Sequence, residues 1–261
     1  MNGVLTVHVD GIGWRSPGLA DWDAARSLLR DGGAPALIGA SGASPALLPP
    51  NERRRAPDTV LLACDVAGQA CAMAASEPAQ LPCVFASMHG DIAITEHLCM
   101  TLAANPLELS PTKFHNSVLN AAAGYWTVAT QCHAASNALS ASGASFAAGL
   151  FEAAAEAHAN GTSTLFAAYD AGARGALAET MRAEASHGVA FVLSPERGAR
   201  TVAALRLRHD GDGDGAEVPE ARGSWFGVAL LPLFGALAHG HSARLRLPAG
   251  RGTALAIEVL A

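Results

Sequence analysis

The sequence predicts an α/β protein, because segments typical of strands and of helices alternate through its middle. Residues 163–171 are apolar on both faces, as a central buried strand is, and the Ala-rich segments around them have helical length. The chain has 261 residues, 50% of them hydrophobic, so it can bury a core in one domain or in two closely joined halves. Abundant Ala and Gly with few aromatic residues predict close packing of helices on a sheet.

The first part of the chain is expected to begin with a strand whose apolar and polar residues alternate. A helix then ends before Gly32 and Gly33, and Asp58 caps a second, longer helix. In order, we expect a strand at 4–12, a helix at 21–30, an irregular stretch at 33–50, a helix at 59–76, a strand at 81–88, and helices at 91–104 and 115–130, the last one largely buried.

The second part is expected to continue with a strand, a sharp turn and an Ala-rich helix. Two further strands lie close enough in sequence to form a hairpin, and an acidic, Gly-rich segment after them is typical of a loop. In order, we expect a strand at 137–142, a helix from 144, a strand at 163–171, a strand pair at 188–194 and 200–209, a loop at 209–223, a helix at 225–239, and strands at 242–247 and 253–260.

Charge and hydropathy exclude several classes of partner. The net charge of −6 argues against a nucleic-acid surface, and the basic run Arg53-Arg54-Arg55 is interpreted as a solvated face or a partner contact. The apolar run 225–238 contains Pro232 and is too short for a membrane span. The first residues form a strand pattern rather than a signal peptide, so we predict a cytoplasmic protein.

The cysteines and acidic residues do not suggest a metal or a cofactor. The five cysteines are scattered and apolar in context, as reduced core residues are, and Cys64 and Cys71 have no histidine at metal-ligand spacing. Asp210, Asp212 and Asp214 resemble the start of a calcium loop, but Ala221 stands where the bidentate Glu belongs, so a flexible acidic loop is favoured. We therefore predict neither a metal nor a cofactor.

The turn after the strand at 137–142 resembles a nucleophile site. Gly143 can adopt unusual backbone angles, and a helix N-terminus stabilises negative charge, yet the turn holds serines and no cysteine. The run from Gly143 to Ala147 approximates G-x-S-x-G, which makes Ser145 a candidate hydrolase nucleophile. Possible triad partners lie downstream at Asp170, His187, His239 and His241. Small residues are so frequent in this chain that a chance match is the preferred interpretation, as it is for the adjacent pair Cys132-His133.

The segment "SPTKFHNSVLNAAAGYWTVAT", 110–130, resembles the region before the active site of beta-ketoacyl synthases, the condensing enzymes of fatty-acid and polyketide synthesis. The matching residues are Ser110-Pro111, Phe114, Asn120 and Ala123-Gly124. The form "SVLNAAAGY" is most similar to the short relatives called chain length factors, which occur with aryl polyene and xanthomonadin-type pigment clusters. Weaker similarity extends over most of the chain, including "ASFAAGLFEAA" at 144–155, "TLFAAYD" at 164–170 and "GVAFVLSPERGARTVAALRLR" at 188–208.

This resemblance implies a thiolase-like fold, layered α/β with mixed sheets. A ketosynthase-like half at 1–187 would pack with an abbreviated half at 188–261 as a single compact unit. It also implies where the nucleophilic cysteine of the family would fall: at Gly143, or one residue away at Ser142 or Ala144. No thiol stands there, and "HGHS" at 239–242 lacks the threonines of the family's His-Gly-Thr-Gly-Thr setting.

The resemblance thus implies a catalytically silent chain length factor that pairs with an active beta-ketoacyl-ACP synthase and shapes its acyl tunnel. Acyl chains on an acyl carrier protein would be the substrates of the pair. In dimers of the family the strand before the nucleophile helix pairs with its twofold mate, so the expected interface residues are Tyr125, Trp126, Asn137, Ala138 and Leu139. The alternatives are an independent hydrolase or acyltransferase using Ser145, and a self-associating structural protein without an acyl ligand.

Overall fold

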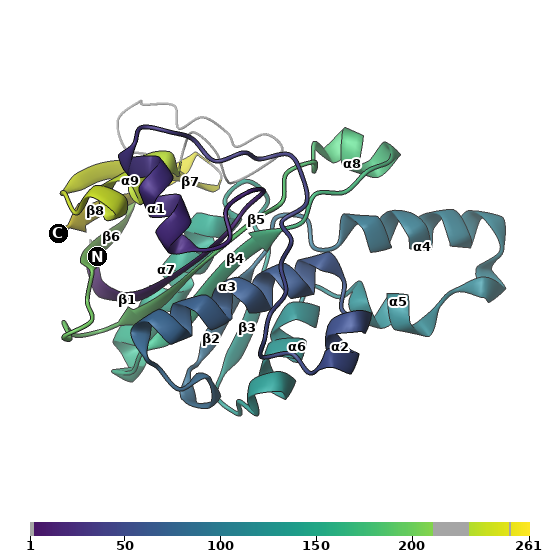
Figure 1. The fold of residues 1–261 in the computed structure, drawn as a ribbon, viewed down its shortest axis with the longest axis horizontal. Helices are drawn as coiled ribbons and strands as arrows, with labels where there is room; N and C mark the ends of the chain where they lie inside the picture. Colours follow the sequence, from purple (N-terminus) through teal and green to yellow (C-terminus); the bar gives the residue numbers. More distant parts are fainter. Residues whose placement is uncertain (1–2, 211–229, 251) are drawn as a thin grey trace.

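A computed structural model describes residues 3–210, 230–250 and 252–261, and its centre is an eight-stranded mixed sheet (Figure 1). The strand order is β3-β2-β4-β5-β1-β6-β8-β7. β2 runs parallel to β3 and β4, and the other neighbours are antiparallel. The strands are β1 Leu5–Arg15, β2 Cys83–Ala86, β3 Ser136–Leu139, β4 Thr164–Asp170, β5 His187–Ser194, β6 Ala203–Asp210, β7 Ala243–Gly250 and β8 Thr253–Leu260.

The two strands expected to form a hairpin, β5 and β6, are separated by β1. β1 pairs with β5 along its C-terminal half and with β6 along its N-terminal half. The hairpin prediction was therefore wrong. Proximity in sequence favoured a local pair, whereas an eleven-residue first strand, apolar where it is buried, supplies a partner from the far end of the chain.

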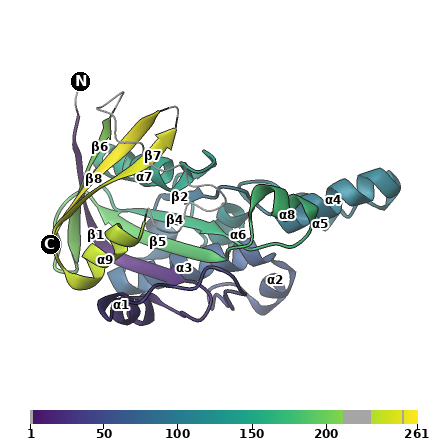
Figure 2. The same cartoon turned by 90° about the horizontal axis from the view of Figure 1, so that it is seen from above.

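Helices cover both faces of the sheet (Figure 2). α3 (Asp58–Ala74) and α6 (Ala121–Thr130) lie on one face, and α7 (Ser145–Asn160) lies on the other. α1 (Trp22–Arg30) packs against α9 (Leu231–His239), where Trp14 meets Phe234 edge-on with ring centroids 4.9 Å apart. All seven residues of β4 are buried, so the prediction of a central strand at 163–171 is confirmed.

Two glycines of β1 explain how closely α3 approaches the sheet. A Cβ on Gly11 would lie 2.0 Å from the carbonyl oxygen of Ala70, and one on Gly13 would lie 1.9 Å from that of Val66. Both distances are impossible contacts with backbone, so only glycine fits at either position. The expected close packing of helices on the sheet is confirmed here.

The helix expected at 115–130 is divided into α5 (Pro111–Asn116) and α6 by a turn at 117–120. The Ser117 hydroxyl donates to the carbonyl of Phe114, and Asn120 precedes α6 as its cap residue. Ser and Asn compete with helical hydrogen bonding through such local bonds, which accounts for the break. The sequence also did not predict α2 (Pro50–Arg55), α8 (Ala176–Met181) or the short 3-10 turns at Pro78–Gln80 and Pro106–Glu108.

Residues 92–116 leave the body of the molecule as a projecting arm, formed by α4 (Ile92–Ala104), the turn Pro106–Glu108 and α5 (Figures 1 and 2). α4 matches the helix expected at 91–104, but Ile92 is its single buried residue. The arm turns back through 117–120 into α6, which returns the chain to the sheet.

The last part of the chain adds β7 and β8 to the same sheet. Most of the acidic loop, the calcium-like pattern after Asp210 and the start of the helix expected at 225–239 lie outside the described residues. Among the helices that the structure describes, none is long and apolar enough to cross a membrane. Nor do the described histidine, cysteine and acidic side chains form a group of three that could hold a metal ion.

Candidate functional site

The turn between β3 and α7 has the sharp backbone that the sequence predicts, but at a different residue. Ser142 has a φ of 51°, the left-handed region that L-residues rarely adopt, and α7 begins three residues later at Ser145. The strained residue thus lies within the window from Ser142 to Ala144 where the family's nucleophile was expected. A strained strand-to-helix turn is typical of a nucleophile elbow, and its left-handed residue here carries a hydroxyl instead of a thiol.

The Ser145 hydroxyl closes this turn. It donates to the carbonyl oxygen of Ser142 at 2.7 Å and accepts from the backbone N–H of Ala141 at 2.9 Å. The residue is 1% exposed. A hydroxyl held in this way lacks the access to substrate that a hydrolase nucleophile needs, so the geometry fits a structural role for Ser145.

The thiols of this chain lie elsewhere. Four of the five cysteines are buried, and the exposed one, Cys99, lies on the arm. Burial raises the pKa of Cys64 and of Cys71 to about 12, and that of Cys83 to about 11. Because the thiolate is the nucleophile, these three side chains are chemically inert at neutral pH.

Of the residues proposed as triad partners, Asp170 and His187 lie together at neighbouring strand ends, whereas His239 and His241 lie near the far edge of the sheet. Asp170 ends β4 and accepts hydrogen bonds from the hydroxyl of Ser87 and from the backbone of the loop after β2. His187 faces Asp170 in the register of β4 and β5, and burial, followed by nearby His89, lowers its pKa to about 3. His239 and His241 lie at the end of α9, beside β7, whereas the turn follows β3 at the opposite edge of the sheet.

β3 is an edge strand with a free side. The N–H of Cys83 donates to Ala135 and that of Ser87 donates to Leu139, so the backbone groups of alternate residues, Asn137 among them, face β2. The backbone groups of Ser136 and Ala138 therefore point away from the sheet. Of the predicted interface residues, Asn137 is exposed, and Ala138 and Leu139 are half-buried.

The two aromatic interface candidates on α6 have different surroundings. Trp126 is 0% exposed and packs in the core against Phe85, with ring centroids 6.3 Å apart. Its assignment to a partner surface is therefore corrected: an apolar helix offers its largest side chain to its own core first. Tyr125 is half-buried, and its hydroxyl lies 3.3 Å from the Asn116 side-chain oxygen.

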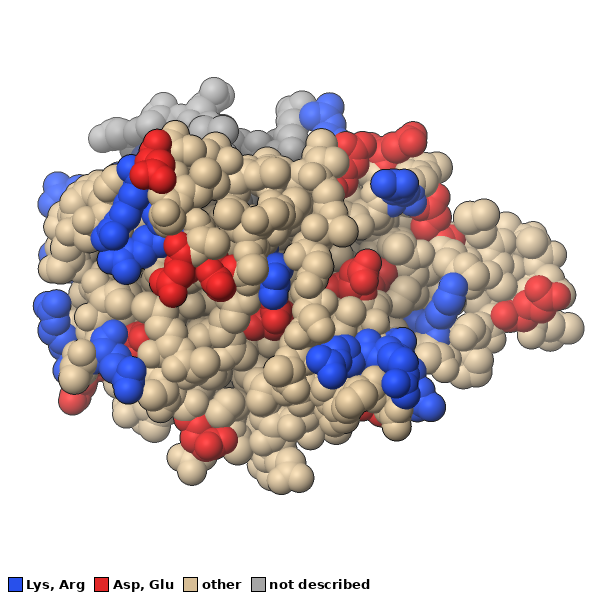
Figure 3. All heavy atoms as spheres, viewed as in Figure 1, with Lys and Arg blue, Asp and Glu red and all other residues tan. Residues whose placement is uncertain are grey.

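Large exposed apolar side chains gather on the arm and on α6. Leu107 is 95% exposed at the end of the arm. The other members are Met100, Leu102, Phe114, Val118 and Val128. Figure 3 shows the projecting arm mostly in tan, with a few acidic and basic side chains on it. An apolar patch of this kind marks an interaction surface in a folded protein.

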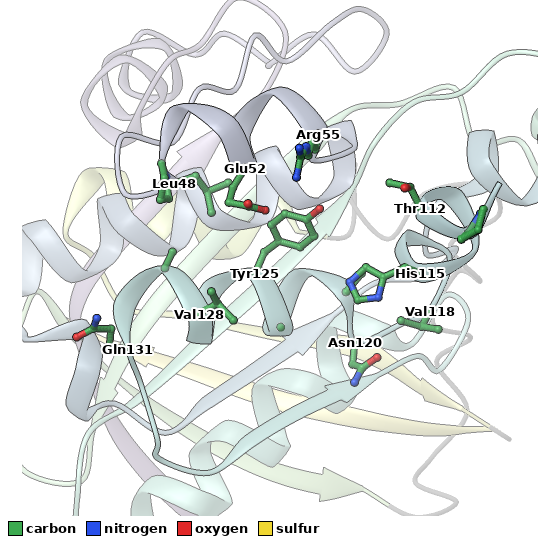
Figure 4. A pocket seen from close by; sticks show the side chains of 15 residues that line it. Leu48, Glu52, Arg55, Thr112, His115, Val118, Asn120, Tyr125, Val128 and Gln131 are labelled. Carbon is green, nitrogen blue, oxygen red and sulfur yellow. The ribbon is translucent and has the colours of Figure 1, made fainter.

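A groove of about 1080 Å³ lies beside this patch, between α2, α5 and α6 (Figure 4). Leu48, Tyr125 and Val128 form part of its apolar lining, while Arg55 and His115 supply polar groups. Arg55 belongs to the basic run of α2, so that run lies at the rim of the groove. Together, the arm, the groove and the free side of β3 are called the docking face below.

The sequence interpretation missed the arm as a functional element. The sequence held a signal for it: "IAITEHLCMTLAA" is mostly apolar without a clear polar face, a pattern that normally indicates burial. A helix with this composition and a single buried residue leaves apolar side chains uncovered on its outer side, as a surface for another chain does.

The fold defines a class, the condensing-enzyme proteins with a thiolase-like architecture, and the turn between β3 and α7 contains no cysteine. The chain belongs to the family described as beta-ketoacyl synthase, N-terminal domain, whose sequence model matches residues 21–225. The resemblance seen in the 110–170 segment is thereby confirmed. No curated protein matches the sequence.

Solved structures support the same fold. The complex of the ketosynthase ApeO with its chain length factor ApeC from Xenorhabdus doucetiae matches with a TM-score of 0.73 at 22% identity, over 97% of this chain and 99% of the matched chain. The ishigamide ketosynthase/chain length factor matches with a TM-score of 0.72 at 15% identity, over 98% and 99%. The complex AntDE:AntF, a type II acyl-carrier protein with its ketosynthase, gives 0.75 at 14% identity over 100% of both chains. The predicted thiolase-like fold is confirmed.

Proposed function

We propose that this chain is the chain length factor of a two-subunit ketosynthase. It pairs with an active beta-ketoacyl-ACP synthase through the docking face and shapes the acyl tunnel of the pair, while the partner supplies the nucleophilic cysteine and the histidines. The substrates of the pair are acyl chains carried by an acyl carrier protein.

The observation that carries this proposal is the uncovered arm. Burying a large apolar side chain contributes roughly 1.5–3 kcal/mol, and Met100, Leu107 and Phe114 are 66%, 95% and 64% exposed. Leaving them in water forgoes that free energy unless a second chain covers them. The free side of β3 offers the same second chain a row of backbone hydrogen bonds.

The matched structures support a partner of this kind. Two of them are named as ketosynthases with their chain length factors, and this chain spans 99% of the matched chain in each. The third is named as a ketosynthase with its acyl-carrier protein. This chain therefore has the length and the fold of the matched chains, which supports a subunit role.

The proposed silence follows from the turn. Claisen condensation needs a thiolate that holds the acyl chain as a thioester and a donor for its carbonyl oxygen. The turn offers Ser142 in the left-handed position, and its other serine, Ser145, is occupied within the turn. We therefore expect the isolated chain not to elongate an acyl chain on its carrier.

The pairing is tested by co-expression with the neighbouring ketosynthase, followed by size-exclusion chromatography with light scattering. The wild-type chain should give a 1:1 complex. Met100→Gln with Leu107→Gln and Phe114→Gln should weaken the complex by a factor of about 100 or more, since three apolar contacts are lost. The same triple variant should be more soluble alone.

A matched control replaces exposed apolar residues outside the docking face. Ile38→Gln with Val202→Gln removes side chains that are 72% and 40% exposed, and this variant should pair like the wild type. A 1:1 complex that tolerates the arm variant would refute the proposal. Elongation by the chain alone would refute its silence, and labelling of Ser145 by a fluorophosphonate probe would favour the hydrolase alternative. Gly143→Ala should leave product formation by the pair intact.

A further inference from the structure

The direction in which the arm leaves the sheet depends on a joint of five residues, 87–91, between the end of β2 and the start of α4. Gly90 has a left-handed φ of 62°, so the chain turns sharply here. Two buried carboxyl groups hold this joint, one at each end.

Asp91 fixes the far end. One of its oxygens accepts the N–H of Ile94 at 2.8 Å and so caps α4, and the other accepts the hydroxyl of Thr59 on α3 at 2.8 Å. The helix start is thereby tied to the body of the molecule.

Asp170, at the end of β4, fixes the near end. Its Oδ1 accepts the Ser87 hydroxyl at 2.6 Å and the N–H of His89 at 3.2 Å, and its Oδ2 accepts the N–H of Met88 at 3.2 Å. From the other side, the hydroxyl of Ser140 donates to the carbonyl of Met88 at 3.1 Å, which links the joint to the turn after β3.

We infer that Asp170 is a positioning residue, whose carboxylate sets the path of residues 87–91 and hence the direction of the arm on the docking face. The inference rests on the proposed pairing only for its consequence in assembly. Asp170 does not touch the partner surface itself: it is 4% exposed beneath the joint.

The cost of burying this group supports a role beyond folding. Burial raises the pKa of Asp170, and the hydrogen bond from Ser87 and the nearby His89 only partly oppose it. A carboxylate that is ionised and buried costs folding free energy, which a neutral residue would avoid. Groups with perturbed pKa values gather at functional sites.

Asp170→Asn separates the two roles. The amide NH₂ cannot accept a hydrogen bond, so in either orientation it opposes an N–H or hydroxyl donor of the joint. The unpaired donor costs free energy, while removal of a buried carboxylate relieves a desolvation cost, so the melting temperature should stay within a few degrees of the wild type. The joint, in contrast, should open.

The experiment measures hydrogen exchange on the full chain, alone and with the co-expressed ketosynthase, together with the affinity of the pair. Asp170→Asn should speed exchange in residues 92–104 about tenfold and weaken pairing about tenfold, as the loss of about one charge-assisted hydrogen bond requires. The matched control is Asp65→Asn. Asp65 is another buried carboxylate, lies on α3 and pairs with Arg15 of β1 at 2.6 Å. This variant should lower the melting temperature and leave exchange in the arm unchanged.

Unchanged exchange in the arm of a folded Asp170→Asn variant would overturn the inference. If that variant does not fold, Ser87→Ala removes one donor to Asp170 and the acceptor of the Gly90 N–H, and it must speed exchange in the arm for the inference to stand. If the wild type forms no complex while Asp170→Asn still loosens the arm, the proposed function fails and the positioning role of Asp170 remains.

Discussion

The sheet has two edges, and they are built in opposite ways. β3 is four residues long, and its sequence, Ser-Asn-Ala-Leu, has no charge and no proline. β7 is eight residues long, carries Arg244 and Arg246, and contains Pro248 next to a register shift. Charged side chains, proline and irregular register are the devices by which natural proteins prevent an edge strand from pairing with another chain.

The difference teaches that exposure of an edge does not by itself indicate an interface. The β7 edge is exposed and protected: Arg244 is 84% exposed and shares Glu258 with Arg206, so charges dominate that side. The β3 edge is exposed and unprotected, and β3 contacts α6, which carries the exposed Val128. A protein that blocks one edge and leaves the other open is adapted to pair at the open one.

The largest effect is expected from a charge in the open edge. Ala138→Asp places a carboxylate beside backbone groups that face the partner, where burial of an unpaired charge costs several kcal/mol. Pairing with the ketosynthase should be abolished, as shown by light scattering on the co-expressed proteins. Arg244→Asp, the matched change on β7, should leave a 1:1 complex.

Proline substitutions at neighbouring positions of β3 distinguish its free side from its paired side. Ala138→Pro removes a donor that points toward the partner, whereas Asn137→Pro removes one that faces β2. The former should abolish pairing while the chain still folds, and the latter should also lower the melting temperature. Equal melting temperatures for the two variants would contradict the register given for β3.

The second effect concerns the protected edge. Arg244→Thr, Arg246→Thr and Pro248→Val together remove its charges and its proline and leave eight residues able to pair. The variant should self-associate with rising concentration, measured by light scattering on the chain alone. A strictly monomeric triple variant would show that the arginines and Pro248 do not protect this edge.

Low pH is expected to destabilise the folded chain, so pairing at the two edges should be compared near neutral pH. The pKa of His187 falls from 6.5 to about 3 on folding, so the unfolded chain binds a proton more readily. The free energy of unfolding should therefore decrease as the pH falls below about 6.5, by up to about 1.4 kcal/mol per pH unit until about pH 3. Denaturant unfolding of the wild type against His187→Gln isolates this contribution, because the variant should lack that part of the slope.

The smallest effect is expected at the turn beyond β3. Ser142→Gly relieves a left-handed residue and should raise the free energy of unfolding by about 0.5–1 kcal/mol. Gln131→Gly, at the left-handed end of α6, should give a similar gain. Neither variant should change pairing, and a destabilising Ser142→Gly would mean that its side chain, and not the backbone, holds the turn.

Much of the fold could be predicted from local pattern. The alternating residues of β1 and the buried run of β4 follow from periodicity. The expected cap at Asp58 was wrong, because Asp58 is the first residue of α3, after the cap residue Pro57, and no side chain makes a capping hydrogen bond there. The position of β1 between β5 and β6 could not be predicted, because strand pairing across nearly two hundred residues leaves no signal in either segment alone. Ser117 and Asn120 could have predicted the break between α5 and α6. The apolar content of 115–130 instead favoured a single helix.

The sharp turn before α7 was predicted from the sequence, but not the residue that makes it. The spacing from Asn120 placed the family's nucleophile position at Gly143, whereas the left-handed angle falls one residue earlier, on Ser142, whose carbonyl accepts the Ser145 hydroxyl. Trp126 was assigned to a surface on the basis of residue type, although side-chain direction on α6 decides burial. Asp170 was a triad candidate by order in the chain, whereas its position at the end of β4 places it under the joint of the arm.

The uncovered arm also has a consequence for synthesis in the cell. A newly made chain carries an apolar helix on its outside from the moment it folds, and such a helix attracts chaperones, proteases and other copies of itself. The pool of unpartnered chains is then limited by degradation. Its abundance would follow that of its partner, so the arm would serve as a device that matches the amounts of two gene products.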